Sequence, residues 1–189
     1  MRIRVWLPDD GVWYVCSPCS SLGLSYANMK FSLPMSYTRL LYHLIFRTKH
    51  SVPAIVPEYE RELYGYIWGF VKNKDSILYR IGGMPEHLHL LFDLSSKYAL
   101  ADFVRDLKTT TAKWLRSNPH FPTFPGWGKG YAAFTYSLKE KETIINYIMR
   151  QKEHHAVVSF EAEVRRMFAE NGLSDKVDFF LKDDEKDVQ

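Results

Sequence analysis

The sequence predicts an α+β domain built on a β-α-β-β-α-β order, with an antiparallel sheet and both crossover helices on one face. Segments rich in strand-forming residues alternate with segments whose apolar residues recur at helical spacing, which gives this order. The two central strand segments are joined only by a short stretch containing Gly and Pro, which favours a hairpin. An additional C-terminal helix, carrying a tyrosine, follows this ferredoxin-like unit.

Periodicity predicts the first strand and the first helix. Residues 40–49, LLYHLIFRTK, are rich in strand formers whose side chains alternate between two faces. A loop containing Pro53 and Pro57 follows. The next apolar residues step at helical spacing and predict a helix: Leu63, Ile67, Phe70 and Val71.

Two strand-like segments come next, residues 76–82 (SILYRIG) and 87–94 (HLHLLFDL). The turn of a hairpin is predicted where the two segments meet. Gly82 ends the first segment, and Gly83 and Pro85 lie between the two.

The second half of the chain repeats the alternation. A second helix is predicted by the spacing of Leu100, Phe103, Val104, Leu107 and Trp114. Residues 131–137, YAAFTYS, predict the fourth strand. Ser137 and Glu140 have the spacing of a capping box, and the helix they open has its apolar stripe at Ile144, Ile145 and Ile148. Residues 160–168 predict a further short helix, ended by Asn171 and Gly172.

Composition indicates one domain with appendages. Residues 1–34 are poorly patterned and are expected to be an extension, residues 35–180 the domain, and 181–189 a frayed tail. Hydrophobic residues make up 46% of the chain, which is ample for a core, and no apolar run reaches the ~18–20 residues that cross a bilayer. The two cysteines, in the order CSPC, cannot form a disulfide framework and favour the cytoplasm. A net charge of +3 permits a nucleic-acid partner without requiring one.

Two histidines stand one residue apart in the predicted third strand. Side chains alternate along a strand, so His87 and His89 share one face while Leu88, Leu90 and Phe92 form the apolar face. We expect the imidazoles to line the surface opposite the core, within reach of one metal ion. Two surface histidines on a polar sheet face are the alternative.

A tyrosine on the third predicted helix lies near an amide side chain. Tyr147 and Gln151 are four residues, or one helical turn, apart and share a face. His154 continues this face, which is turned away from the isoleucine stripe. This face could present a phenol beside a metal ligand. A tyrosine packed at the edge of the core is the alternative, and spacing alone does not decide between them.

These motifs resemble those of the single-tyrosine HUH transposases of simple insertion sequences, which include relatives associated with repetitive extragenic palindromes. The resemblance rests on MPEHLHLLFDL and the later YIMRQ, and extends to HLIFRTK, LKTTTAKWL, GWGKGYAAFTYS and EHH. It implies that His87, His89 and Gln151 hold a divalent ion, magnesium or manganese, and that Tyr147 is the nucleophile. It also implies a homodimer whose subunits share active sites.

The resemblance implies a metal-dependent transposase that cleaves and rejoins single-stranded DNA through a 5′-phosphotyrosine, with a hairpin near the cleavage site. Cations on the second helix could bind phosphates: Arg105, Lys108, Lys113 and Arg116. Without the family, a solvated helix face is the better explanation of these cations. Two other functions stay open. One is a non-catalytic nucleic-acid-binding module, because RNA-recognition domains share the strand and helix order. The other is a domesticated relative that cleaves DNA without moving its own element.

Overall fold

The computed structural model describes residues 3–6, 13–16 and 37–182, and the chain divides into two compact units, residues 1–37 and 38–189. In the first unit, β1 (Ile3–Trp6) pairs antiparallel with β2 (Trp13–Cys16). The sequence did not predict this pair, because strands of four residues are too short to show a clear alternation. The second cysteine of CSPC and the predicted frayed tail from 183 onward lie outside the described residues.

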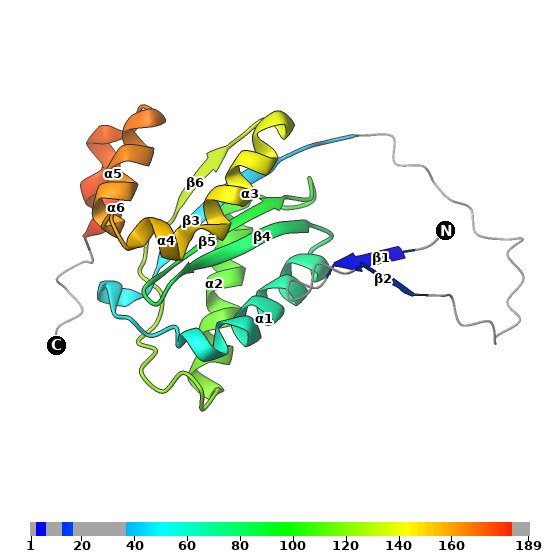
Figure 1. Cartoon of the computed structure of the whole chain (residues 1–189), viewed down its shortest axis with the longest axis horizontal. Helices are drawn as coiled ribbons and strands as arrows, with labels where there is room; N and C mark the ends of the chain where they lie inside the picture. The colour runs from blue at the N-terminus through cyan, green and yellow to red at the C-terminus, as the bar shows by residue number, and fades with distance from the viewer. Residues whose placement is uncertain (1–2, 7–12, 17–36, 183–189) are drawn as a thin grey trace, which may run out of the picture. The chain divides into compact units, whose positions relative to one another are not determined.

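The second unit is built around a four-stranded antiparallel sheet with strand order β4-β5-β3-β6 (Figure 1). Its strands are β3 (Leu41–Arg47), β4 (Ile77–Met84), β5 (His87–Asp93) and β6 (Ala132–Thr135). The predicted fold class is confirmed, with β5 inserted between the two strands that the first crossover joins.

The turn between β4 and β5 is shorter than the sequence predicted. Strand β4 continues through Gly82 and Gly83 to Met84, which leaves Pro85 and Glu86 for the turn. A Cβ atom at Gly83 would collide with the carbonyl oxygen of His87. Glycine is therefore needed here for the close approach of two strands.

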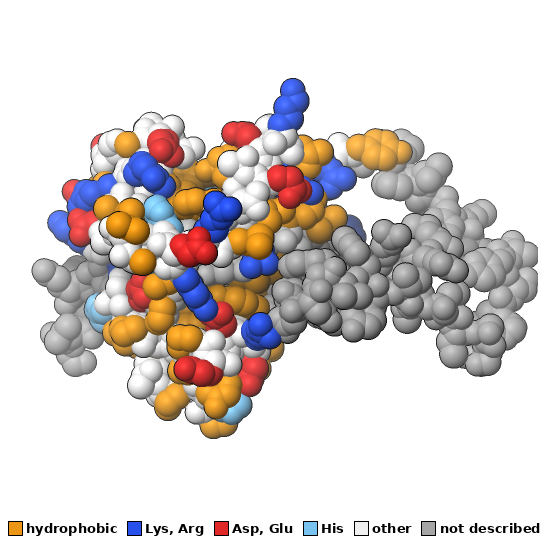
Figure 2. All heavy atoms as spheres, in the orientation of Figure 1, with side chains coloured by type: hydrophobic (Ala, Val, Ile, Leu, Met, Phe, Trp, Pro, Cys, Tyr) orange, Lys and Arg blue, Asp and Glu red, His pale blue; other side chains and the backbone are white. Residues whose placement is uncertain are grey.

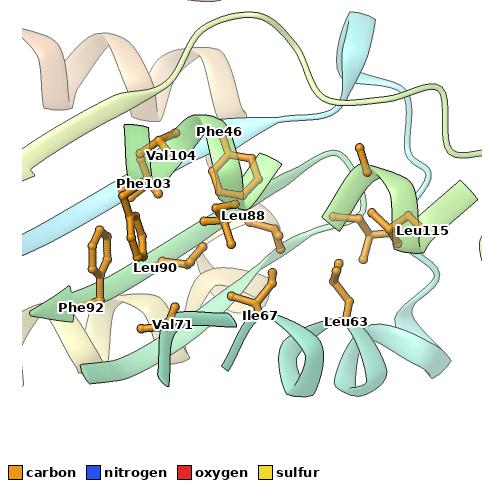
Figure 3. Packing of buried hydrophobic residues seen from close by; sticks show 14 of the residues in the cluster. Phe46, Leu63, Ile67, Val71, Leu88, Leu90, Phe92, Phe103, Val104 and Leu115 are labelled. Atoms are coloured by element: carbon orange, nitrogen blue, oxygen red, sulfur yellow. The ribbon is translucent and has the colours of Figure 1, made fainter. Parts of the chain in front are cut away.

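One face of the sheet carries the predicted hydrophobic core. Helices α1 (Glu60–Asn73) and α2 (Leu100–Ser117) pack on this face (Figure 1). Figure 3 shows strand side chains meeting helix side chains between the two layers. The labelled residues are Phe46, Leu63, Ile67, Val71, Leu88, Leu90, Phe92, Phe103, Val104 and Leu115. Burial of such a side chain contributes roughly 1.5–3 kcal/mol each, so this layer is the main source of stability.

The opposite face is covered by the C-terminal part of the chain: α3 (Lys141–Met149), α4 (Gln151–His155), α5 (Phe160–Glu170) and α6 (Val177–Leu181). Ile148 of α3 packs with Leu91, and Val164 of α5 packs with Ile45. The predicted capping box at Ser137 is present and opens a 3-10 turn ahead of α3. Further 3-10 turns are Lys49–Ser51, Pro57–Tyr59 and Ser174–Lys176.

This second helical layer corrects the expectation that the histidines face solvent. His87 and His89 do lie on the face opposite the main core, but both are 0% exposed. The sequence predicted the strand correctly and missed the layer that covers it, because strand alternation shows which residues share a face but not what packs against it. Among the described residues, no helix is long and apolar enough to cross a membrane.

Candidate active site

The two histidines of β5 are held in fixed orientations by partners on the outer edge of each ring. The Nδ1 atom of His87 lies 3.0 Å from a carboxylate oxygen of Glu86. The Nδ1 atom of His89 lies 3.0 Å from Nε2 of His43, which comes from the neighbouring strand β3. Because both Nδ1 atoms are occupied, both Nε2 atoms remain available as ligand atoms on the side facing α4 and α5.

Burial favours the neutral form of His89 and of His43. Burial, with a smaller contribution from the neighbouring His87, lowers the pKa of His89 to about 4, although Glu163 opposes the shift. Burial also holds the pKa of His43 well below its usual range, with His89 adding to the effect. Neutral imidazole is the form that binds metal ions, so His89 is held in the form that a metal ligand requires.

Two C-terminal residues complete a buried cluster with this pair. His155 lies at the end of α4 and Glu163 in α5. One carboxylate oxygen of Glu163, Oε2, lies 4.0 Å from Nε2 of His87, 3.7 Å from that of His89 and 3.1 Å from that of His155. Ligand atoms from all four side chains lie within 4.8 Å of one another.

These atoms have no hydrogen-bond partner among the described residues, although they are buried. They are Nε2 of His87, His89 and His155 and Oε2 of Glu163. Oε1 of Gln151, whose Nε2 atom donates to Glu163, is also buried without a partner. A buried polar atom without a partner costs roughly 1–3 kcal/mol, so several around one point need a common explanation. A metal ion satisfies them together, and imidazole nitrogens with carboxylate and amide oxygens are a suitable donor set for one. The cluster can therefore hold a metal ion.

The predicted nucleophile lies at the same carboxylate. The hydroxyl of Tyr147 donates a hydrogen bond to Oε1 of Glu163, and Nε2 of Gln151 donates to the same oxygen over 2.9 Å. Burial raises the pKa of the Tyr147 phenol well above its usual value, and the negative charge of Glu163 raises it further. The phenol is therefore protonated at neutral pH in this arrangement.

Tyr147 and Gln151 lie on two successive helices rather than on one continuous helix. Arg150, with backbone angles of φ −95° and ψ 15°, separates α3 from α4. Both side chains nevertheless point to the same side, since each donates a hydrogen bond to Oε1 of Glu163. His154, the third residue of the predicted face, keeps an exposed fraction of 20% and lies 3.9 Å from Oε1 of Glu163.

The environment of Glu163 favours its ionised form. Burial by itself would raise the pKa of this carboxyl group, but the facing His155, His89 and Tyr147 together hold it far below its usual range. In return, Glu163 raises the pKa of His155 against the effect of burial. The centre of the cluster therefore holds an anion surrounded by donors and ligand atoms.

Sequence reasoning missed Glu163, although a signal was present. Phe160, Val164, Met167 and Phe168 form the apolar stripe of α5, and Glu163 occupies a position within that stripe. A carboxylate is almost never fully buried without partners, so a charge at an apolar position points to a site. His155 belongs to the EHH motif, residues 153–155, but this motif did not predict it as a ligand.

The four cations predicted to contact DNA all lie in α2, but they differ in their surroundings. Lys108 donates hydrogen bonds to the carbonyl groups of residues 128–130 and therefore holds the loop before β6. Arg105 pairs with Asp102 and Asp106. The remaining two are exposed: Lys113 and Arg116.

Trp127, in the loop before β6, is packed into the fold. Its ring lies edge-on to Phe46 at 4.7 Å, and its Nε1 atom donates to the Thr111 hydroxyl over 2.9 Å.

A surface pocket of about 490 Å³ borders the tyrosine from outside. Its lining comes from α3, α4 and the break between them: Thr143, Asn146, Tyr147, Arg150, Glu153 and His154. Basic and acidic side chains are interspersed on the face that carries α3 and α4 (Figure 2). The pocket thus gives access to one side of Tyr147, whereas the histidine pair behind it is fully buried.

A split antiparallel sheet with His–Leu–His on a central strand, faced by a tyrosine on a following helix, defines the class of single-tyrosine HUH transposases. The chain belongs to the family described as "Transposase IS200 like", whose model matches residues 36–151. The resemblance drawn from the motifs is thereby confirmed. His155 and Glu163 lie beyond the matched residues.

The chain is also similar to individual proteins. The ISDra2 transposase TnpA of Deinococcus radiodurans is 26% identical over 125 residues, which cover 61% of this chain and 86% of the relative. A crystal structure of a putative transposase from D. radiodurans R1 is 27% identical with a TM-score of 0.47, over 62% of this chain and 94% of that one. A REP-associated tyrosine transposase, solved bound to a REP hairpin, is 13% identical with a TM-score of 0.50, over 65% and 73% of the two chains, and supports the fold.

Proposed function

We propose that this transposase cleaves and rejoins single-stranded DNA through a covalent 5′-phosphotyrosine formed on Tyr147. One observation carries the proposal. The tyrosine hydroxyl and the Nε2 atoms of the two β5 histidines all approach a single carboxylate, that of Glu163. A nucleophile and a pair of metal ligands therefore converge on a position occupied by an anion, as the attack on a phosphate oxyanion requires.

The residues fit a metal-assisted phosphoryl transfer. A divalent ion held by His87, His89 and Gln151, magnesium or manganese by the resemblance, would supply charge that offsets the negative phosphodiester. Magnesium prefers oxygen ligands, so the imidazole donors favour manganese.

The proposed cleavage begins at the phenol of Tyr147. The phenolic oxygen of Tyr147 attacks phosphorus, and its proton passes to the Glu163 oxygen that already accepts its hydrogen bond. The 3′ oxygen of the upstream strand leaves and takes a proton from water. The bond energy is retained in the phosphotyrosine, so a 3′-hydroxyl can later attack it, release the phenol and rejoin DNA without ATP.

The substrate strand is proposed to reach Tyr147 through the pocket beside α3. Arg150 and Asn146 line this pocket and can contact phosphate oxygens. Lys113 and Arg116, which are exposed on α2, are proposed to hold DNA further away, with Arg105 engaging phosphates when it leaves its aspartates. Lys108 is proposed to act through the loop that it fixes. A hairpin near the cleavage site is the expected substrate feature, in line with the hairpin bound by the REP-associated relative.

The proposal includes the homodimer that the resemblance implies, with α3 exchanged between subunits. In the structure, α3 lies over the histidines of its own chain, with Tyr147 and His89 ring centroids 6.1 Å apart. Mixing Tyr147→Phe chains with His89→Ala chains separates the two arrangements. Restored adduct formation supports exchange, and no restoration shows that each site works within one chain.

The central test is adduct formation. Labelled single-stranded DNA carrying a hairpin, incubated with the protein and Mn²⁺, should become covalently attached to it. Tyr147→Phe removes only the hydroxyl, so the fold and DNA binding should survive while the adduct disappears. Peptide mapping should place the adduct in residues 142–150.

Tyr136→Phe is the matched control, because Tyr136 also lies beside His43 but, unlike Tyr147, has no hydrogen bond to Glu163 in the described part of the chain. This variant should form the adduct. Binding of DNA by the unchanged protein with no adduct would indicate a binding module, and an adduct that persists in Tyr147→Phe would exclude Tyr147 as its only attachment site. Lys113→Ala with Arg116→Ala should weaken DNA binding in the same assay.

A further inference from the structure

The C-terminal helices contribute a histidine that is prepared like the two on β5. The Nδ1 atom of His155 lies 2.9 Å from the carbonyl oxygen of Val158. A carbonyl oxygen can only accept, so Nδ1 carries a proton, and in the neutral ring that binds a metal ion Nε2 presents its lone pair. All three imidazoles therefore have Nδ1 occupied and Nε2 directed at Glu163, which is the usual arrangement of metal-bound histidines.

The two oxygens of the Glu163 carboxylate have separate environments. Oε1 accepts hydrogen bonds from Tyr147 and Gln151. Oε2 faces the three imidazole nitrogens at 3.1–4.0 Å and accepts no hydrogen bond from the described residues. One oxygen is thus engaged with the nucleophile, and the other is directed into the group of unpartnered ligand atoms.

We infer that His155 and Glu163 are additional ligands of the metal ion, so that metal binding fastens α4 and α5 to the histidine strand. This inference rests on the proposed function in taking His87 and His89 as the metal site. It differs from the ligand set that the motifs implied, because half of the cluster comes from the segment beyond the matched residues 36–151.

Two alternatives explain less. A plain ion pair between His155 and Glu163 accounts for their 3.1 Å approach but leaves the nitrogens of both β5 histidines without a partner. If only His87, His89 and Gln151 bound the metal ion, Oε2 of Glu163 would stay buried without a partner. Ligation by all of them satisfies every one of these atoms at once.

Metal affinity tests the inference without reference to catalysis. Titration of the full chain with Mn²⁺, measured by calorimetry, should show that each chain binds one ion. Glu163→Gln and His155→Ala should each weaken binding by at least about tenfold, because even outer-sphere partners of a metal site have effects of this size. Glu161→Gln is the matched control, since Glu161 lies on the same helix and is exposed, where it pairs with Arg165.

Backbone hydrogen exchange provides a second readout, and its first measurement is made on the unchanged protein. Addition of Mn²⁺ to the unchanged protein should slow amide exchange in residues 160–170, and this protection should be lost in Glu163→Gln. Unchanged affinity in a folded Glu163→Gln variant, or no protection of residues 160–170 by Mn²⁺, would overturn the inference. Either result would leave adduct formation on Tyr147 intact, whereas failure of adduct formation would leave both readouts unaffected.

Discussion

At the residue scale, the histidine pair depends on a third histidine in the neighbouring strand. His43 is buried, and its Nε2 atom lies 3.0 Å from Nδ1 of His89. This contact fixes the rotation of the His89 ring and leaves Nε2 of His89 directed at Glu163. We therefore propose that His43 is a positioning residue, which acts on the proposed metal site through His89.

We predict that His43→Leu, which keeps a comparable buried volume but removes the ring nitrogens, lowers Mn²⁺ affinity by about 10–100-fold. The affinity of the folded variant should be measured by calorimetry, with its secondary structure checked by circular dichroism. His120→Ala is a suitable control, because His120 pairs with Glu62 well away from the site and should leave affinity unchanged. An unaltered affinity in His43→Leu would refute the positioning role.

The residues of the site differ in how far the sequence could predict them. His87 and His89 are adjacent on one strand, so their convergence follows from strand geometry alone. Tyr147 required a resemblance, because nothing local relates it to the histidine strand. Glu163 required the tertiary structure, since it reaches the site only after α5 packs on Ile45 and its neighbours.

At the element scale, the close contact between α3 and β4 determines where the tyrosine lies. Gly82 of β4 lies beneath Ile148 of α3, and a Cβ atom there would be 2.9 Å from the Ile148 carbonyl oxygen and 3.0 Å from its Cγ2 atom. The backbone oxygen cannot move without the helix. Glycine at this position lets α3 approach closely enough for Tyr147 to reach Glu163.

We predict that Gly82→Ala displaces α3, costs about 1–3 kcal/mol of stability as an overpacking change, and strongly reduces adduct formation. Urea unfolding and the adduct assay measure the two effects. Gly69→Ala is the matched control, because nothing lies within 4 Å of the added Cβ in α1. It should stabilise the protein by about 0.5–1 kcal/mol and leave the adduct unchanged. Equal behaviour of both variants would contradict the proposed role of Gly82.

Elements with a continuous apolar stripe could be predicted well, and breaks within helices could not. The core faces of α1 and α2 follow the spacing of Leu63, Ile67, Phe103 and Leu107. The break at Arg150 has neither Pro nor Gly to mark it, and it follows from the packing of Gln151 against Glu163. Helix α6 was missed because it has only five residues.

At the scale of the whole molecule, the second unit is a sheet between two helical layers, and the layers have different roles. The layer of α1 and α2 supplies the main core (Figure 3). The layer of α3 to α6 supplies Tyr147, Gln151, His155 and Glu163 to the site. Arg47 of β3 connects this layer to the sheet by donating to the carbonyl oxygen of Leu181 at the end of α6 over 2.7 Å. The candidate site and the main hydrophobic core therefore lie on opposite faces of β5.

Every residue assigned to the site lies in the second unit, residues 38–189, and the family model begins at residue 36. We predict that a chain starting at Met35 folds with the same melting temperature as the full chain and forms the Tyr147 adduct in equal yield. The physical reason is that the described residues of the second unit form hydrophobic core clusters of their own. Thermal unfolding and the adduct assay, run side by side on both lengths, measure this. A lower melting temperature would show that residues 1–34 stabilise the domain, and a lower yield at equal stability would show that they contribute to binding or cleaving DNA.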